Sequence, residues 1–464
     1  MAFNSYLFLL FLPLVLCCFY LTAEKHRWKI LLVSSYLFYM LYKAEYGLIL
    51  LFSTSVCWFV GNLISRSSDK QQRKRYLIIG IIIDAGILFV FKYFGLFESL
   101  FESIKNPEAL QNSPETILLP IGISFYTFKS LGYLIDVYRN VTKPEPHFGH
   151  FALYVSFFPQ LIAGPIERAN ELIPQLHAPK KLSYDDLMYG CSRMAWGFFK
   201  KLVVADTVAG FVNFTFADID SANGIQLYIS LLFFAVQLYA DFSGYCDIAI
   251  GTARLFGIRL SENFNQPYLA TSIADYWNRW HMTLTAWIRD YIFIPLNRGV
   301  TTYSRIYLNT LVVFLLIGLW HGASLSFVVF GLLNGIISVL QSLYKRVQFL
   351  PKFKSKAGKI FLIIWNFHLL ILTGVIFRAK NFTDALLYYK KLFTDFGFGL
   401  QKMLNGFSGY EFALCCIVAA LFVAAVRLPK HFKFKYAYGF LFAVVALVIL
   451  LGRNNAETFI YFQF

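Results

Sequence analysis

Apolar runs long enough to cross a bilayer recur along the chain, separated by short polar segments. A membrane helix needs about 20 predominantly apolar residues. The clear candidates are Phe3–Tyr20, Trp28–Tyr42, Tyr46–Ser65, Tyr76–Phe94, Ile225–Ala240, Leu308–Leu343, Ile360–Phe377, Glu411–Val426 and Tyr436–Leu451. Between Ile117 and Val212 the apolar pattern is broken by Pro, Gly and charge, which favours short or re-entrant helices packed inside protein. The pattern predicts an all-α polytopic membrane protein with about 10–12 transmembrane helices.

Composition supports a membrane protein and excludes other classes. Of 464 residues, 58% are hydrophobic and 15% are charged, against roughly 25% charged in soluble domains. The net charge of +16 sits in short loops between apolar runs, and no nucleic-acid-binding motif accompanies it. The seven cysteines show no metal-binding spacing and are predicted to be small apolar side chains. The N-terminus has no positive region before its apolar run, so we expect a transmembrane helix there and not a signal peptide.

Lys and Arg asymmetry predicts the topology. The loop with Lys25, Arg27 and Lys29 and the loop 66–75 are both basic, and by parity they lie on one side, which should be cytoplasmic. The acidic loop 98–115 should then lie outside, together with both chain ends.

Ionisable residues at membrane depth are costly and indicate either ion pairs or function. Asp241, Asp247 and Arg254 directly follow an apolar helix, and we interpret them as structural charge pairs that fix helix packing. The stretch 274–288 is too polar to cross a membrane as a helix. On one helix, Asn278, His281 and Thr285 would share a face, with Trp277 beside them. Such a face is typical of a cavity lining.

His321 ends an otherwise apolar run and is followed by small residues, with Gly318 one turn earlier to leave room for a substrate or another backbone. A desolvated histidine stays neutral, which suits a general base. The alternative is a buried histidine hydrogen-bonded to a neighbouring helix, which we favour for His368. His147 and His150 could form half a metal site, but no third ligand is evident and we predict no metal centre.

Six strings together resemble the membrane-bound O-acyltransferase family, and within it the bacterial alginate and peptidoglycan O-acetyltransferases. They are Leu119–Arg139, Phe158–Arg168, Tyr239–Ile258, Asn263–Leu296, Leu319–Ser324 and the terminal FIYFQF. Each string alone is weak, and their order and spacing make the match specific.

The resemblance implies a single integral membrane domain over 1–464, with a catalytic core region at 117–324 and a central tunnel. By the family's pattern, His321 and His281 would be the catalytic histidines. The expected tunnel lining is Asn278, Trp277, Thr285, Trp320 and Ser324. No cofactor is expected to be bound. The donor would be acetyl-CoA or an acyl carrier thioester from the cytoplasm.

The function implied is transfer of acetyl across the bacterial inner membrane for O-acetylation of a cell-wall or exported polysaccharide. The partners would be the acyl donor, membrane lipid and an extracytoplasmic SGNH-type acetyltransferase, with no nucleic acid. The outward FIYFQF tail would be a docking element or an interfacial anchor. The alternatives are D-alanyl transfer to teichoic acid by the same fold, a transporter or flippase, and a structural scaffold.

Overall fold

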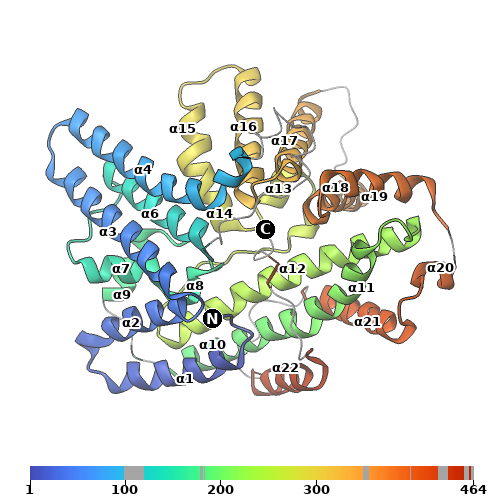
Figure 1. The fold of residues 1–464 in the computed structure, drawn as a ribbon, viewed down its shortest axis with the longest axis horizontal. Coiled ribbons are helices and arrows are strands. Elements are labelled where there is room, and N and C mark those ends of the chain that lie inside the picture. Colours follow the sequence, from blue (N-terminus) through green and yellow to red (C-terminus); the bar gives the residue numbers. More distant parts are fainter. Residues whose placement is uncertain are drawn as a thin grey trace. The chain divides into compact units, whose positions relative to one another are not determined.

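The computed structural model describes residues 1–98, 120–177, 181, 183–347, 355–397, 399–426, 437–453 and 459–460, and within these ranges the chain is helical without strands (Figure 1). An all-α fold is therefore confirmed. The chain forms two compact units. The first unit contains Met1–Gly197 and Tyr245–Glu262, and the second contains Phe198–Gly244 and Asn263–Phe464. Most of the acidic loop expected outside, 99–115, lies beyond the described residues.

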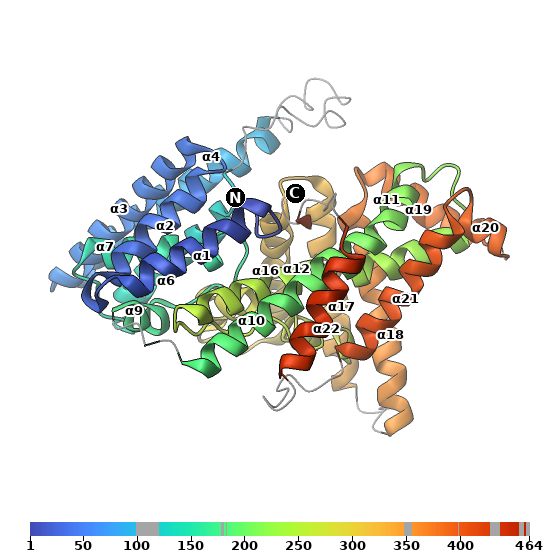
Figure 2. The ribbon, with the colours of Figure 1, turned by 90° about the horizontal axis from the view of Figure 1, so that it is seen from below.

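The first unit contains the N-terminal helices. They are α1 (Tyr6–Leu21), η1 (Glu24–His26), α2 (Arg27–Met40), α3 (Ala44–Arg66), α4 (Lys70–Lys92), α6 (Ile123–Tyr138), α7 (Phe148–Ser156), α8 (Phe158–Leu161), α9 (Ala169–His177) and nearly all of α10 (Tyr184–Phe198). Helices α3, α4 and α6 pack against one another (Figures 1 and 2). Local sequence sets where helices begin. The Asp69 carboxylate, for example, accepts hydrogen bonds from the backbone N–H groups of Gln71 and Gln72 and caps α4.

The second unit begins with a π-helical segment and continues to the C-terminus. Its elements are η3 (Phe199–Ala205), α11 (Asp206–Ala217), the first part of α12 (Gly224–Leu255), η4 (Pro267–Leu269), α13 (Ile273–Trp277), α14 (Met282–Ile288), η5 (Arg289–Phe293), α15 (Ile294–Asn297), α16 (Tyr303–His321), α17 (Leu325–Arg346), α18 (Lys356–Arg378), α19 (Phe382–Thr394), α20 (Leu400–Leu404), α21 (Gly409–Ala425) and α22 (Ala437–Leu451). Helices α16 and α17 form a hairpin, and α17 also packs on α18 (Figure 1).

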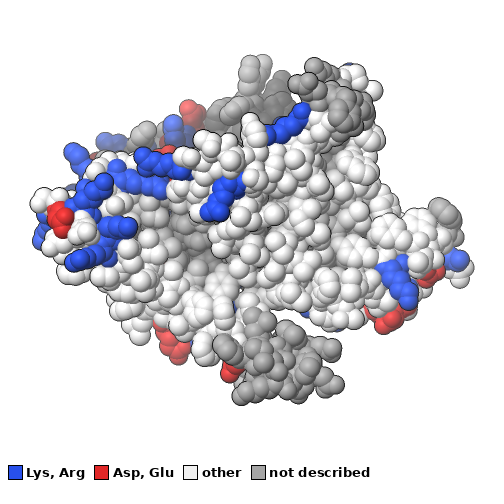
Figure 3. Space-filling view, turned by 90° about the horizontal axis from the view of Figure 1, so that it is seen from above, with Lys and Arg blue, Asp and Glu red and all other residues white. Residues whose placement is uncertain are grey.

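Five of the described helices are long and apolar enough to cross a membrane. They are α3, α12, α16, α17 and α18, and three further apolar helices are shorter. Large apolar side chains are exposed on such helices, as a lipid-facing surface requires; Leu48 of α3 and Leu340 of α17 are 68% and 58% exposed. The charged side chains on the face seen in Figure 3 are few, and Lys and Arg gather on its left, toward the α3–α4 end of the first unit. The chain is therefore a multi-pass membrane protein.

Two local expectations were wrong. The run Leu308–Leu343 is two helices, because the chain turns between His321 and Leu325. Helix α12 does not end near Ala240 but continues through the polar stretch to Leu255. At the start of the C-terminal tail, Phe459 and Ile460 are buried, with 5% and 1% of their surface exposed. Tyr461–Phe464 lie outside the described residues.

The candidate acyl-transfer pocket

A pocket in the second unit contains His321. Its empty volume is about 550 Å³, a figure that includes the open solvent at its mouth. The walls come from α12, η4, α13, α17 and α18, and His321 ends α16. The lining residues are Phe234, Ala235, Leu238, Tyr268, Tyr276, Trp277, Trp280, His321, Phe330, Asn334, Leu370, Ile371, Thr373, Gly374 and Phe377. The pocket is mainly apolar, with a few polar groups.

His321 is held among aromatic rings at the end of α16. It is 5% exposed, and its ring centroid lies 4.9 Å from that of Trp320, 5.2 Å from that of Phe377 and 5.8 Å from that of Phe330. This environment excludes water from most of the imidazole.

The small residues around His321 serve helix packing. A Cβ added at Gly318 would lie 2.2 Å from the carbonyl oxygen of Phe327, and one at Gly331 would lie 2.4 Å from that of Phe314. Glycines at both positions let α16 and α17 approach until their backbones touch. At Gly322 a Cβ would collide with the Phe327 ring. The room that the sequence indicated at Gly318 is therefore filled by another backbone, not by substrate.

His281 lies outside the set of pocket-lining residues but contacts the same tryptophan as His321. Its ring centroid is 5.6 Å from that of Trp320 and 4.8 Å from that of Phe242, and the residue is completely buried. The expected single helix over 274–288 was wrong. Helix α13 ends at Trp277, His281 has a left-handed backbone (φ 44°, ψ 53°), and α14 begins at Met282.

Asn263 explains this backbone conformation and fixes the His281 tautomer. The Asn263 Oδ1 accepts hydrogen bonds from the backbone N–H and the hydroxyl of Thr283, at 3.1 and 2.9 Å, and lies 3.2 Å from Nδ1 of His281. An amide oxygen only accepts, so Nδ1 of His281 carries the proton and Nε2 carries the lone pair. Burial lowers the pKa of His281 to about 3, so the ring is neutral at physiological pH.

The structure brings some predicted lining residues to the pocket and not others. Trp277 lines it, whereas Trp320 is not among the lining residues and its ring contacts both histidines. Asn278 is exposed on the turn after α13, Thr285 bonds back to the Trp280 carbonyl at 3.4 Å, and Ser324 precedes α17. None of these last three is among the lining residues.

Two polar pocket atoms have no hydrogen-bond partner among the described residues. One is the indole N–H of Trp277, and the other is Oδ1 of Asn334, a residue of α17 that is 1% exposed. The Asn334 amide nitrogen donates to the Phe330 carbonyl at 2.9 Å, which directs Oδ1 away from the helix backbone. Buried polar groups are normally paired. A donor and an acceptor left open beside His321 suit a polar ligand. Sequence reasoning missed Asn334 and Trp280, although an Asn within an apolar run carries the same signal as His321.

The charged residues of α12 lie in ion pairs. The Lys201 Nζ is 3.0 Å from a carboxylate oxygen of Asp241 and 2.8 Å from one of Asp206. In the first unit, Arg193 lies 2.6 Å from Asp247, and Arg254 lies 2.5 Å from Asp186. Asp241 also accepts the backbone N–H of Ile460 at 2.7 Å, which ties the tail to α12.

His368 shows what a fully partnered histidine looks like in this fold. It lies on α18, half-buried, with Nε2 2.9 Å from the Tyr228 hydroxyl and Nδ1 2.8 Å from the Ile364 carbonyl oxygen. It is therefore hydrogen-bonded to the neighbouring α12 and is absent from the pocket lining.

Comparison with known proteins identifies the family. Residues 90–379 match the model of the membrane-bound O-acyltransferase family. The Pseudomonas aeruginosa protein named "Probable alginate O-acetylase AlgI" is 37% identical over 91% of this chain and 81% of its own length. The Helicobacter pylori "Peptidoglycan O-acetyltransferase" is 35% identical over 77% of this chain and 72% of its own, and the Bacillus subtilis "Teichoic acid D-alanyltransferase" is 27% identical over 58% and 71%. The chain belongs to the membrane-bound O-acyltransferase family and is an O-acyltransferase.

Proposed function

We propose that this enzyme transfers acetyl from a cytoplasmic thioester, acetyl-CoA or an acyl carrier, for O-acetylation of a cell-wall or exported polysaccharide. The observation that carries the proposal is the pocket in which His321 stands beside an open N–H donor on Trp277 and an open acceptor on Asn334. Relatives named as alginate and peptidoglycan O-acetyltransferases align over more of the chain, at higher identity, than those named for D-alanyl transfer. Acetyl is therefore favoured over D-alanyl as cargo.

Each polar residue of the pocket has a separate role in the proposed reaction. His321 accepts the proton of the acceptor hydroxyl. The hydroxyl oxygen attacks the carbonyl carbon of the thioester at the same time. The indole N–H of Trp277 stabilises the negative charge that develops on the carbonyl oxygen. The carbon–sulfur bond then breaks, and the proton held by His321 passes to the departing thiolate. The amide oxygen of Asn334 accepts a hydrogen bond from the hydroxyl nucleophile and orients it.

His281 has a supporting role in this scheme. Its Nδ1–H donates to the Asn263 amide oxygen, and its ring packs against the ring of Trp320. We assign His281 to positioning Trp320 and, through it, His321. A separate extracytoplasmic acetyltransferase, of the SGNH type, would then carry acetyl from the outer face to the polysaccharide.

The test is a deletion strain complemented with wild type, His321→Ala or His368→Ala. The O-acetyl content of purified cell wall and of exported polysaccharide is measured, with membrane levels of each protein checked by blotting. We expect wild type and His368→Ala to restore acetylation, and His321→Ala to fall by about 10²–10⁴-fold, the usual contribution of a general base. The fraction whose O-acetyl content depends on the enzyme, cell wall or exported polysaccharide, identifies the polysaccharide that is acetylated. Full activity of His321→Ala contradicts the mechanism, and unchanged ester content on deletion contradicts acetyl transfer.

A further inference from the structure

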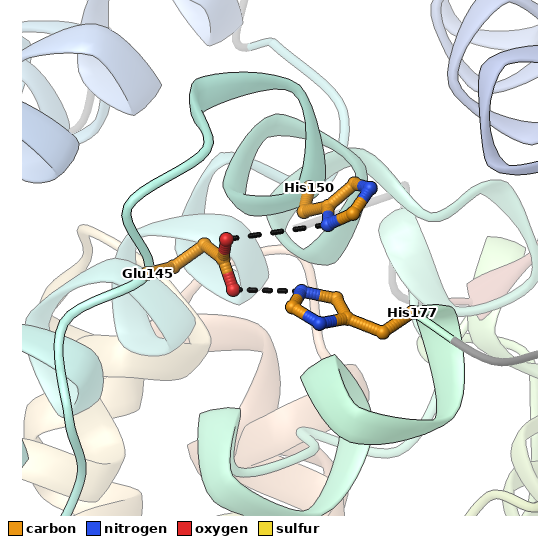
Figure 4. Close-up of side chains that lie close together, drawn as sticks. All are labelled: Glu145, His150 and His177. Carbon is orange, nitrogen blue, oxygen red and sulfur yellow. Dashed lines mark hydrogen bonds and ion pairs between the residues drawn. The ribbon is translucent and has the colours of Figure 1, made fainter.

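Three metal-ligating side chains converge in the first unit, away from the pocket. Glu145 precedes α7, His150 lies on α7, and His177 ends α9. One ligand atom from each lies within 4.8 Å of the others. Figure 4 shows the two imidazoles on the same side of the Glu145 carboxylate, each directed at a different oxygen. The three residues come from separate segments, so the tertiary fold supplies the third ligand that sequence inspection did not find beside His150.

The spacing of the ligand atoms fits a small divalent cation. Nε2 of His177 lies 2.8 Å from one oxygen of Glu145, and Nδ1 of His150 lies 4.0 Å from the other. Zinc–ligand bonds of about 2.0–2.1 Å in tetrahedral geometry place neighbouring ligand atoms about 3.3 Å apart. The two histidine–carboxylate distances bracket that value, and all three ligand atoms lie within 4.8 Å of one another.

The carboxylate is held in place by its surroundings. The Glu145 backbone N–H donates to the Tyr133 hydroxyl at 3.0 Å, and its carbonyl accepts the Trp58 indole N–H at 2.8 Å. The backbone N–H of His147 donates to a carboxylate oxygen of Glu145 at 3.0 Å, an outer contact of the kind that orients metal ligands. The site is thus built before any ion arrives.

An ion pair alone does not account for the cluster. A Glu145–His177 pair would satisfy those two groups but leaves Nδ1 of His150 buried with no hydrogen-bond partner among the described residues. At 4.0 Å from the carboxylate, that nitrogen is too far for a hydrogen bond. A cation between the three groups satisfies all of them.

We propose that Glu145, His150 and His177 form a Zn²⁺ site that ties the segment before α7 to the end of α9, with a fourth position open to water. The site lies near the basic loop of this unit. The Arg73 guanidinium donates to the carbonyl of Tyr138 at 2.9 Å, at the end of α6, a few residues before Glu145. By the positive-inside rule this end faces the cytoplasm, which would supply the ion.

The experiment uses the full-length protein in detergent, stripped with a chelator and dialysed against Zn²⁺. Bound zinc is quantified by mass spectrometry, and melting temperature is measured with and without zinc. The variants are His177→Ala, Glu145→Gln and, as a matched control, His26→Ala. His177 is 42% exposed, so its truncation removes a ligand with little loss of packing, and His26 is an exposed histidine of the same unit outside the cluster.

We expect one zinc per chain and a zinc-dependent rise in melting temperature for wild type and His26→Ala. His177→Ala and Glu145→Gln should each lower zinc affinity by more than about 100-fold. Losing a residue that only hydrogen-bonds to a metal ligand lowers affinity by about 10–100-fold, and losing a ligand itself should cost more. Their melting temperatures should no longer respond to zinc. Zinc binding by wild type no stronger than by His177→Ala would overturn the proposal, as would an equal loss in His26→Ala. The elution volume of Glu145→Gln in size-exclusion chromatography shows whether this variant is folded. If it is folded, a loss of zinc binding comes from the missing carboxylate and not from misfolding.

Discussion

Replacing Gly318 by alanine should separate α16 from α17 and displace His321. The added Cβ would lie 2.2 Å from the carbonyl oxygen of Phe327 and 3.0 Å from Cα of Gly331, whereas ordinary van der Waals contact begins at 3.4 Å. Both obstacles are backbone atoms, so no side-chain rotation relieves the clash. The helices must move apart by more than 1 Å at this point.

The substitution of Gly318 should change both folding stability and the rate of acyl transfer, and the size of each change can be estimated separately. Overpacking of a tight interface costs about 1–3 kcal/mol of folding stability. His321 lies one turn beyond Gly318 on the same helix, and a displacement of roughly 1 Å at a reacting group costs about 100-fold in rate. We therefore expect a lower unfolding midpoint in detergent and a drop of about 100-fold in acyl transfer.

Gly86→Ala is the matched control. Gly86 also lies inside a helix, α4, but a Cβ there meets nothing within 4 Å. Alanine is favoured over glycine in a helix by about 0.8–1 kcal/mol, so this variant should be as stable as wild type or more so. Midpoints are measured by scanning fluorimetry and transfer by polysaccharide ester content. A Gly318→Ala protein that melts and transfers like wild type would refute the packing argument.

Three further predictions concern buried polar groups. Lys201→Met removes the cation that Asp206 and Asp241 share, whose side chains are only 2% and 3% exposed, and should lower the free energy of unfolding by about 3–5 kcal/mol. Adding Asp241→Asn should recover part of the loss, and a wild-type midpoint for the single variant would contradict this prediction. Trp277→Phe removes the open N–H donor and should lower acyl transfer by about 10²–10³-fold with an unchanged melting temperature; equal activity would remove Trp277 from the mechanism. Burial lowers the pKa of His281 from 6.5 to about 3, so between these pH values the unfolded chain binds a proton that the folded chain does not, and stability falls as pH decreases. His281→Asn, which tolerates the left-handed backbone, should show a shallower loss of melting temperature between pH 6.5 and pH 4 than wild type.

The fold class could be predicted because lipid imposes a simple requirement. Long apolar segments must form helices, and their length and spacing are visible in the sequence. Family membership could be predicted from the ordered strings around His281 and His321. The family match also replaces the transporter and scaffold alternatives with an O-acyltransferase.

The local conformation around His281 could not be predicted in the same way. Periodicity assumes a continuous helix, whereas the chain breaks where His281 takes a left-handed backbone. That conformation is disfavoured for a residue with a side chain, and tertiary contacts must stabilise it. Asn263, which supplies them, lies 18 residues earlier. The same limit applies to Glu145 and His177, 32 residues apart, whose meeting depends on the packing of α7 on α9.

The buried polar residues of the second unit fall into two groups, and the difference separates structure from chemistry. Lys201 and Asp241 satisfy each other inside the protein, so replacing either one should act first on stability. Trp277 and Asn334 instead line one pocket, and each carries a buried polar atom with no hydrogen-bond partner among the described residues, an arrangement that costs folding free energy. His321 lies in the same pocket, at the end of a helix whose close packing on α17 depends on glycine. Sequence alone marks Asp241 and His321 as anomalous at membrane depth. The ion pair of Lys201 and Asp241 indicates a structural role, whereas a place in the pocket lining favours a role in acyl transfer.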